Sequence, residues 1–142
     1  PVRIARYRDS DLERLLCDEG IIRNRQKILA AVRNARAFLD LAEREGSFST
    51  WLWDFADGRP IVGGWDTQEQ IPARTPLSQH VSRELKSRGF GFMGPVVVYS
   101  HMQAVGLVND HLRDCFRYAE LSSRRTWSSS TERSSTPARD ST

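Results

Sequence analysis

A glycine-rich run between two helix-like stretches is the part of the sequence best suited to binding an anion. The run LKSRGFGFMGP occupies residues 85–95. Glycine lets the backbone approach a ligand closely, and a helix starting at Pro95 would present unpaired N–H groups where its dipole favours phosphate. The sequence therefore predicts a phosphate-binding turn made of Lys86, Arg88, Gly89, Phe90, Gly91 and Gly94.

The apolar residues of this run are expected to hold the turn in place. We expect Phe90, Phe92 and Met93 to anchor it in the core, so that its amides are fixed before a ligand arrives. The alternative is an ordinary helical hairpin whose glycines only serve the turn.

His111 and Cys115 could provide metal chemistry. They lie four residues apart on a short helix predicted to begin at Asn109 or Asp110, so both side chains would project from one face and could bind one Zn²⁺. The alternative is a chance pairing of a capped histidine with a buried thiol.

Helical periodicity predicts the elements that position these groups. We expect a short helix capped by Asp9 or Ser10 and ending at Cys17. Further helices are expected over residues 23–44, 47–58 and 95–108 and from Pro76 or Ser78 to Arg88, with residues 58–75 as a loop. Trp51 and Trp53 are predicted core residues, and no strand alternation or repeat is detected. The predicted fold is all-α over residues 1–118. In residues 121–142, Ser and Thr fill 12 of 22 positions, which predicts a disordered tail over residues 119–142.

The composition permits nucleic acid as a partner. The net charge is +3 and only Lys27 and Lys86 are lysines, so arginine, which binds phosphate bidentately, carries most of the positive charge; a GC-rich genome is the alternative cause.

No apolar run approaches the roughly 20 residues of a membrane span. The chain starts at Pro1 without a leader, which we interpret as an N-terminal truncation. Two cysteines suit a reducing cytosol, and we expect a cytoplasmic monomer.

Beyond these patterns, the chain resembles the C-terminal portion of the DNA-3-methyladenine glycosylases I, the constitutive bacterial type. The resemblance spans roughly residues 10–117. It is carried, in order, by residues 20–25, 27–28, 34–37, Trp53, Phe55, 77–78, 85–86, 88–90, 92–95, Tyr99, 102–104, Gly106 and 108–111.

This resemblance implies a helix-hairpin-helix DNA glycosylase fold and release of 3-methyladenine from double-stranded alkylated DNA. Such enzymes flip the nucleotide out of the duplex while the hairpin holds the phosphate backbone. It also implies that the base-binding aromatic residues and the pocket glutamate come from a segment preceding Pro1, so no catalytic residue is transferred.

The resemblance gives the metal pair a role as well. Family members hold a structural zinc with such a His–Cys pair and two ligands from the N-terminus. We therefore expect His111 and Cys115 to form half a site that binds zinc weakly or not at all. The remaining candidates, Cys17, His80 and His101, occupy positions that the family does not use for metal.

Three further expectations concern single positions. Asp110 follows the hairpin as a catalytic aspartate would, but a helix cap is the preferred interpretation. His80 and His101 could face DNA, although solvated or core positions are more common for histidine. Family members often carry hydroxyl residues where Val96 and Val97 stand and a basic residue where Gly91 stands.

The sequence leaves three functions to compare. The first is a DNA glycosylase, and the second is a non-catalytic helix-hairpin-helix fragment that binds DNA. The third is a helical scaffold that binds protein, which would show no salt-dependent DNA affinity.

Overall fold

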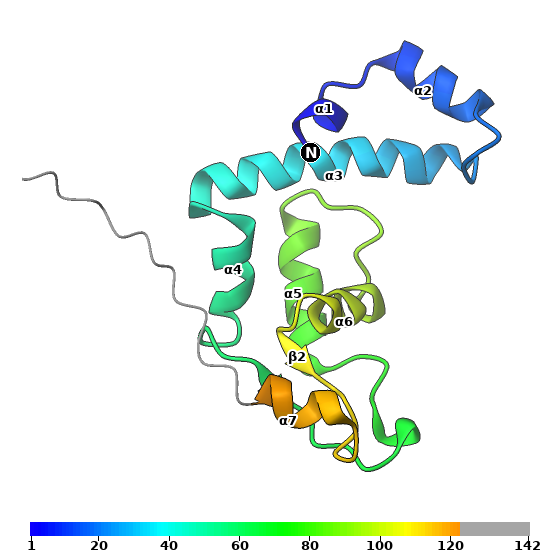
Figure 1. The fold of residues 1–142 in the computed structure, drawn as a ribbon. Helices are drawn as coiled ribbons and strands as arrows, with labels where there is room; N and C mark the ends of the chain where they lie inside the picture. Colours follow the sequence, from blue (N-terminus) through cyan, green and yellow to red (C-terminus); the bar gives the residue numbers. More distant parts are fainter. Residues whose placement is uncertain (123–142) are drawn as a thin grey trace, which may run out of the picture.

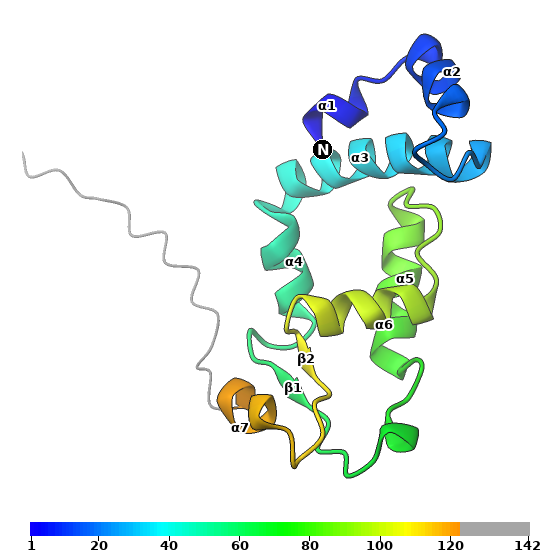
Figure 2. The same ribbon diagram turned by 45° about the vertical axis from the view of Figure 1, so that its right-hand side comes forward.

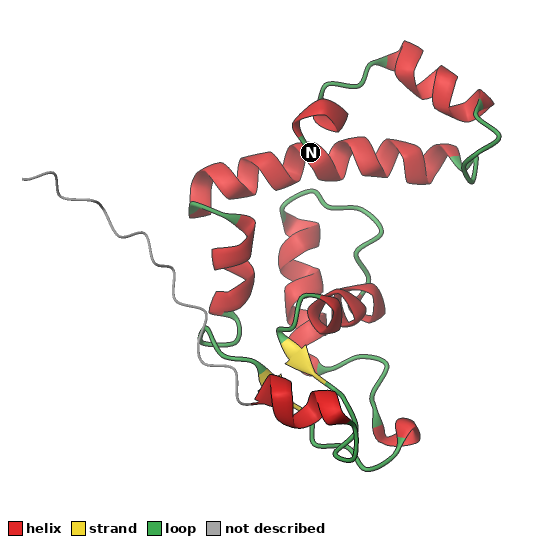
Figure 3. Cartoon of the chain, viewed as in Figure 1, coloured by secondary structure: helices red, strands yellow, loops and turns green. Residues whose placement is uncertain are grey.

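Helices dominate the protein, as the sequence predicts. A computed structural model describes residues 1–122. Over this range the elements are α1 (Val2–Ala5), α2 (Asp9–Cys17), α3 (Arg25–Glu45), α4 (Phe48–Asp54), β1 (Ile61–Val62), the 3-10 turn η1 (Gln68–Gln70), α5 (Pro76–Ser87), α6 (Pro95–Ala104), β2 (Val108–Asn109) and α7 (Phe116–Ser122). Figure 3 shows how little of this part of the chain is strand.

The long helix α3 separates two parts of the fold. Asn24 caps it by accepting a hydrogen bond from the Lys27 amide at 3.1 Å. Helices α1 and α2 lie on one side of α3, whereas α4, α5 and α6 lie on the other (Figure 1), and the turned view agrees (Figure 2). Neither α1 nor α2 contains a buried residue. Arg36 fastens α1 to α3 by donating to the carbonyl oxygens of Ala5, at 2.9 Å, and Tyr7, at 3.3 Å.

The core lies between α4, α5 and α6. Val81 and Leu85 of α5 pack with Met102 of α6 and Leu107, all of them almost completely buried. Trp51 is buried and Trp53 is half-buried against the same core, which confirms the prediction for both. Burial of these side chains fixes the angle at which α5 and α6 leave the hairpin between them.

Two short strands occupy positions where the sequence predicts a loop and a helix. β1 pairs with β2 in parallel, with Ile61 opposite Val108 and Val62 opposite Asn109. The Gly63 amide continues the ladder to the Asn109 carbonyl at 3.0 Å. The predicted helix starting at Asn109 or Asp110 is therefore wrong, because these residues enter a strand and a turn. A ladder of two residue pairs leaves no alternating pattern to detect.

Helix boundaries also differ from the prediction. α6 ends at Ala104 rather than near residue 108, because Gly106 takes a φ of +78° and leaves the helical path. The N-cap of α2 is Arg8, whose amide donates to the Asp11 carboxylate at 3.0 Å, so neither Asp9 nor Ser10 caps it.

Two further predictions concern the C-terminal end of the chain and membrane-spanning helices. α7 reaches Ser122 and so crosses the predicted boundary at residue 118; the rest of the predicted tail lies outside the described residues. Among the helices of residues 1–122, none has the length and apolar character needed to cross a membrane.

Candidate nucleic-acid interface

The turn between α5 and α6 begins with amides that the protein itself uses. The Gly89 amide donates to Lys86 O at 3.0 Å, and the Phe90 amide donates to Leu85 O at 3.1 Å. Gly89 makes this possible with a φ of +87°. The Phe90 ring is buried and anchors the turn in the core, as predicted.

Asn34 of α3 then holds the middle of the turn. Its Oδ1 accepts from the Gly91 amide at 2.7 Å, and its Nδ2 donates to the Gly91 carbonyl at 3.0 Å. On the other side of the turn, the buried Ser82 hydroxyl donates to Met93 O at 2.6 Å. The Gly91 amide is therefore engaged inside the fold, which corrects the expectation that it faces a phosphate.

The amides after Gly91 are free to bind an anion. Within residues 1–122, no acceptor takes the amide hydrogens of Phe92, Met93, Gly94, Val96 or Val97. They surround the N-terminus of α6, where Pro95 occupies the first turn and the helix dipole favours negative charge. A Cβ atom at Gly94 would meet nothing within 4 Å, so this position is open to an incoming group.

Two cationic side chains come from the helices next to this turn. Lys86 is exposed in the last turn of α5. Arg33 of α3 reaches the turn, since its Nη2 would lie 2.7 Å from a Cβ atom at Gly91. The Arg33 guanidinium therefore supplies positive charge beside Gly91.

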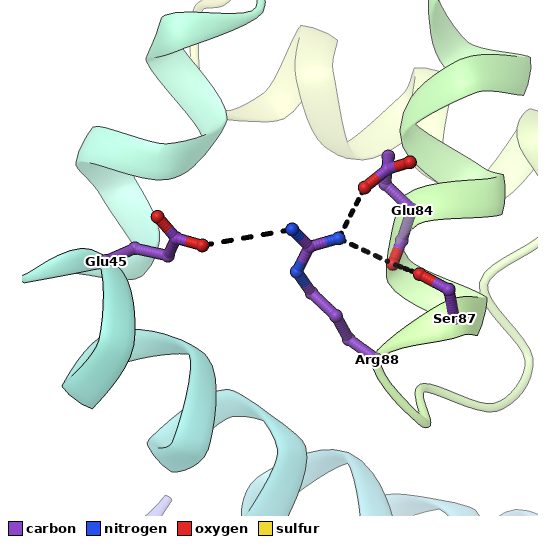
Figure 4. A network of polar contacts seen from close by, with 4 residues as sticks. All are labelled: Glu45, Glu84, Ser87 and Arg88. Atoms are coloured by element: carbon purple, nitrogen blue, oxygen red, sulfur yellow. Dashed lines mark hydrogen bonds and ion pairs between the residues drawn. The ribbon is translucent and has the colours of Figure 1, made fainter.

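Arg88, by contrast, is used within the fold (Figure 4). Its guanidinium donates to the Glu84 carboxylate and carbonyl, lies 3.8 Å from the Glu45 carboxylate and covers the Trp51 ring at 5.3 Å. The hydrogen bond from Arg88 lowers the pKa of Glu84. These contacts join the C-terminal ends of α3 and α5 to α4, so Arg88 has its partners in the protein rather than facing a phosphate as the sequence predicts.

Substitution of Arg88 and Lys86 should separate these two roles. We expect Arg88→Ala to lower the melting temperature more than Arg83→Ala, the exposed arginine on the same helix, and to leave the salt dependence of DNA binding unchanged. Lys86→Ala should leave the melting temperature unchanged and reduce the slope of log K against log salt by about one. Thermal melts and binding titrations at several salt concentrations measure both. A reduced slope in Arg88→Ala would show that its guanidinium does contact phosphate.

Phe92 departs from the sequence prediction more strongly than its neighbours. It was expected in the core with Phe90 and Met93, but its side chain is 54% exposed and its φ is +57°. Met93 does pack against the core. The turn is thus anchored by Phe90 and Met93, while Phe92 projects from it.

Asp110 is the centre of a hydrogen-bond network rather than a helix cap. Its carboxylate accepts from Trp65 Nε1 at 2.7 Å, Tyr99 OH at 2.5 Å and Gln103 Nε2 at 2.8 Å. Burial and this bond to Asp110 raise the pKa of Tyr99 above its usual range. The carboxylate therefore ties the loop after β1 to α6, and the cap interpretation is wrong.

His111 and Cys115 approach each other although they do not share a helix. Both lie in the turn before α7, and Cys115 Sγ is 3.7 Å from His111 Nδ1. Two ligands of one tetrahedral zinc lie about 3.6 Å apart, given the usual Zn–S and Zn–N lengths. The pair therefore fits two positions of a zinc site. Among the residues described, no group of three or more His, Cys, Asp or Glu side chains gathers around a common point.

The remaining histidines and Cys17 lie elsewhere. The exposed His80 ring stands 5.6 Å from Phe55, and the half-buried His101 ring stands 6.2 Å from Phe48. Both histidines therefore border the aromatic side of the core. Cys17 is exposed at the end of α2.

A cavity of about 1160 Å³ adjoins this region, which sequence reasoning did not identify. It lies between α4, the end of α6, β2 and α7, and its lining includes Trp53, Gln103, Asp110, His111 and Cys115. The Asp110 network and the His111–Cys115 pair thus border one hollow in the surface.

Sequence reasoning also missed the residues that hold the turn in place. Asn34, Ser82 and Arg33 were not assigned to it, because their contacts join segments far apart in the chain. One signal was present: asparagine is a poor residue for a helix interior unless its side chain has a specific partner.

Comparison with known proteins places the chain in a family. A family model described as methyladenine glycosylase matches residues 1–118. The DNA-3-methyladenine glycosylase 1 of Escherichia coli is 44% identical over 118 residues, which are 83% of this chain and 63% of that protein. The DNA-3-methyladenine glycosylase of Haemophilus influenzae is 38% identical over 115 residues, or 81% of this chain and 62% of that one.

Solved structures agree with the sequence comparisons. A crystal structure of a 3-methyladenine DNA glycosylase I superposes with a TM-score of 0.78 at 46% identity, covering 82% of this chain and 64% of that one. A Staphylococcus aureus 3-methyladenine DNA glycosylase I gives 0.79 at 32% identity over 83% and 63%. The chain thus spans about 63% of the length of the curated relative from E. coli. Sequence and fold together show that the chain belongs to the methyladenine glycosylase family.

Proposed function

We propose that this protein acts in base-excision DNA repair by hydrolysing the N-glycosidic bond that joins 3-methyladenine to double-stranded alkylated DNA. The match to the methyladenine glycosylase family over residues 1–118 carries this proposal. One of the similar solved structures, at 32% identity, is a 3-methyladenine DNA glycosylase I in complex with 3-methyladenine.

The turn between α5 and α6 supports DNA binding as part of this function. We interpret α5, the turn and α6 as a helix-hairpin-helix motif whose free amides, from Phe92 to Val97, bind one phosphate of the backbone. Asn34 and Ser82 hold the turn before DNA arrives, so little conformational entropy is lost on binding. Lys86 and Arg33 add positive charge next to the same phosphate.

The chemistry of the substrate limits what the protein must supply. A base alkylated at N3 is cationic and already a good leaving group, so stabilising the positive charge that develops on the sugar matters more than strong acid catalysis. The flipped nucleotide also needs a pocket. We assign no catalytic residue in this chain, since both oxygens of Asp110 are engaged by the donors of Trp65, Tyr99 and Gln103.

A direct assay separates this function from its alternative, a helix-hairpin-helix fragment that binds DNA without catalysis. The second function is favoured by one observation, that both oxygens of Asp110, the carboxylate that follows the hairpin, are engaged within the fold. The purified chain is incubated with methylated DNA, and free 3-methyladenine is followed by chromatography, with unmethylated DNA as the control. Release of the base supports the enzyme. Salt-dependent binding without release supports the fragment, and no DNA affinity would contradict both.

Gly94 offers a test of where the phosphate binds. We expect Gly94→Leu to weaken binding to duplex DNA at least tenfold, roughly the loss of one charge-assisted contact, because the new side chain would occupy the approach to the free amides. Gly94 has a φ of −71° and an added Cβ meets nothing within 4 Å, so the fold should tolerate the change. Fluorescence anisotropy measures the affinity, and an unchanged melting temperature is the control. Undiminished binding by this variant would exclude the turn as the phosphate site.

For the metal, we propose that His111 and Cys115 are two of four zinc ligands. Their 3.7 Å separation supports this assignment. When bound, zinc would crosslink its ligands and stabilise the fold rather than react. A closed structural site needs two more ligands, so the expectation that this chain alone binds zinc weakly or not at all stays a prediction, as does that of a cytoplasmic monomer.

A further inference from the structure

Phe92 has a backbone conformation that its residue type rarely adopts. Its φ of +57° lies in the left-handed region, as does the φ of +49° at Asp57. Aspartate tolerates this region because its short side chain bonds locally, whereas a bulky aromatic residue does not. A glycine would adopt the conformation freely. The position therefore carries a phenylalanine where the backbone alone would favour glycine.

The surrounding contacts impose this conformation from both sides. Asn34 holds both backbone groups of Gly91, immediately before Phe92. The buried Ser82 hydroxyl holds the carbonyl of Met93, immediately after it. Phe92 lies between two fixed residues, and its ring is directed by them out of the protein.

The core does not use the Phe92 ring. The side chain is 54% exposed, whereas Phe90, two residues earlier, is 8% exposed and fills the core. Val96 and Val97, in the first turn of α6, are each 50% exposed. These three exposed apolar side chains belong to residues whose amides are free, and we call them together the Phe92 patch.

The charges around the Phe92 patch suit a DNA strand. Lys86 and Arg33 lie beside the turn, and the nearby carboxylate of Glu84 is paired with Arg88. A nucleic-acid strand presents a phosphate next to an apolar sugar and base. The free amides can bind the phosphate, and the exposed Phe92 ring can pack against the sugar and base.

We propose that the Phe92 ring packs against the sugar and base of the nucleotide next to the phosphate that the turn binds. This inference rests on the proposed function, because it requires DNA at the turn. The contact is apolar and independent of sequence, since every nucleotide presents the apolar face of its sugar, and a base next to an abasic or flipped-out position also exposes its ring face. It adds to the DNA affinity of the turn a contribution that salt does not screen, whereas salt weakens the phosphate contacts.

Two substitutions of Phe92 distinguish its ring from its backbone. Phe92→Ala removes the ring and keeps a side chain in the left-handed region, whereas Phe92→Gly removes both the ring and the conformational conflict. The probe is a fluorescein-labelled duplex with a tetrahydrofuran abasic-site analogue, titrated with the full 142-residue chain at several salt concentrations. We expect both variants to lose affinity about tenfold, as for aromatic side chains that stack on nucleic acid, with an unchanged salt slope. The melting temperature of Phe92→Gly should equal or exceed that of the unmodified chain.

Phe116→Ala is the matched control. Phe116 is another exposed aromatic residue, at 78% exposure on α7, and its replacement should leave affinity unchanged. Unchanged affinity in Phe92→Ala would overturn the inference. A reduced salt slope in Phe92→Gly would also overturn it, because the ring would then act through phosphate binding. A lowered melting temperature in Phe92→Gly would overturn it as well, because the ring would then stabilise the fold. No DNA affinity in the unmodified chain would instead overturn the proposed function.

Discussion

Replacing Asp110 with alanine should lower the free energy of unfolding by roughly 3 kcal/mol, because one buried and two half-buried donors lose their acceptor together. Trp65, Tyr99 and Gln103 all donate to this one carboxylate. The fit is close, since a Cβ atom at Gly63 would lie 2.5 Å from Asp110 Oδ1 and 2.1 Å from Trp65 Nε1. Urea denaturation measures the change through the transition midpoint and slope.

Asp114→Ala is the matched control for Asp110. Asp114 is an exposed carboxylate in the same turn, so its replacement should change the free energy of unfolding by less than about 0.5 kcal/mol. Asp110→Asn should fall between the two, because it keeps one acceptor oxygen in place. A loss in Asp110→Ala no larger than in Asp114→Ala would show that the three donors find other partners.

Asn34→Ala should have the second large effect, on both stability and DNA affinity. It leaves the Gly91 amide and carbonyl without partners, which costs about 2 kcal/mol. It also frees the backbone that fixes Phe92 and the amides after it, so we expect affinity for duplex DNA to fall by more than tenfold, of the order of a lost charge-assisted contact. Denaturation and anisotropy titrations on one preparation measure both quantities.

Another asparagine on the same helix provides the comparison for Asn34. Asn24 caps α3, so Asn24→Ala should cost about 1 kcal/mol of stability. Its contact lies outside the turn, and DNA affinity should be kept. Equal affinity in the two variants would mean that the order of the turn does not matter for binding.

The parts of the fold that follow from local sequence were predictable. Ser47 caps α4, and Pro76 and Pro95 stand in the first turns of α5 and α6, where the sequence predicts these helices to begin. The glycine-rich run likewise marks a real turn. These signals act between residues three or four apart, so periodicity and capping rules detect them.

The parts that join distant residues were not predictable. The Asn34–Gly91 contact spans 57 positions and the Trp65–Asp110 contact spans 45, and no local rule connects such pairs. Asp110 looked like a helix cap because aspartate is common there. Arg88 looked like a phosphate ligand because one of its acidic partners, Glu45, comes from a distant helix, although Glu84, four residues earlier, was a local signal of an ion pair. His111 and Cys115 do meet, but through a turn rather than the predicted helix.

The layer formed by α1 and α2 should have a lower local stability against unfolding than the part of the fold that contains α5 and α6. These helices bury no residue and are fastened to α3 by polar contacts such as those of Arg36. A segment without a fully buried side chain opens at a lower free energy than the whole fold. Its amide hydrogens should therefore exchange with solvent while those of α5 and α6 stay protected, so the layer of α1 and α2 can open locally without disturbing the turn between α5 and α6.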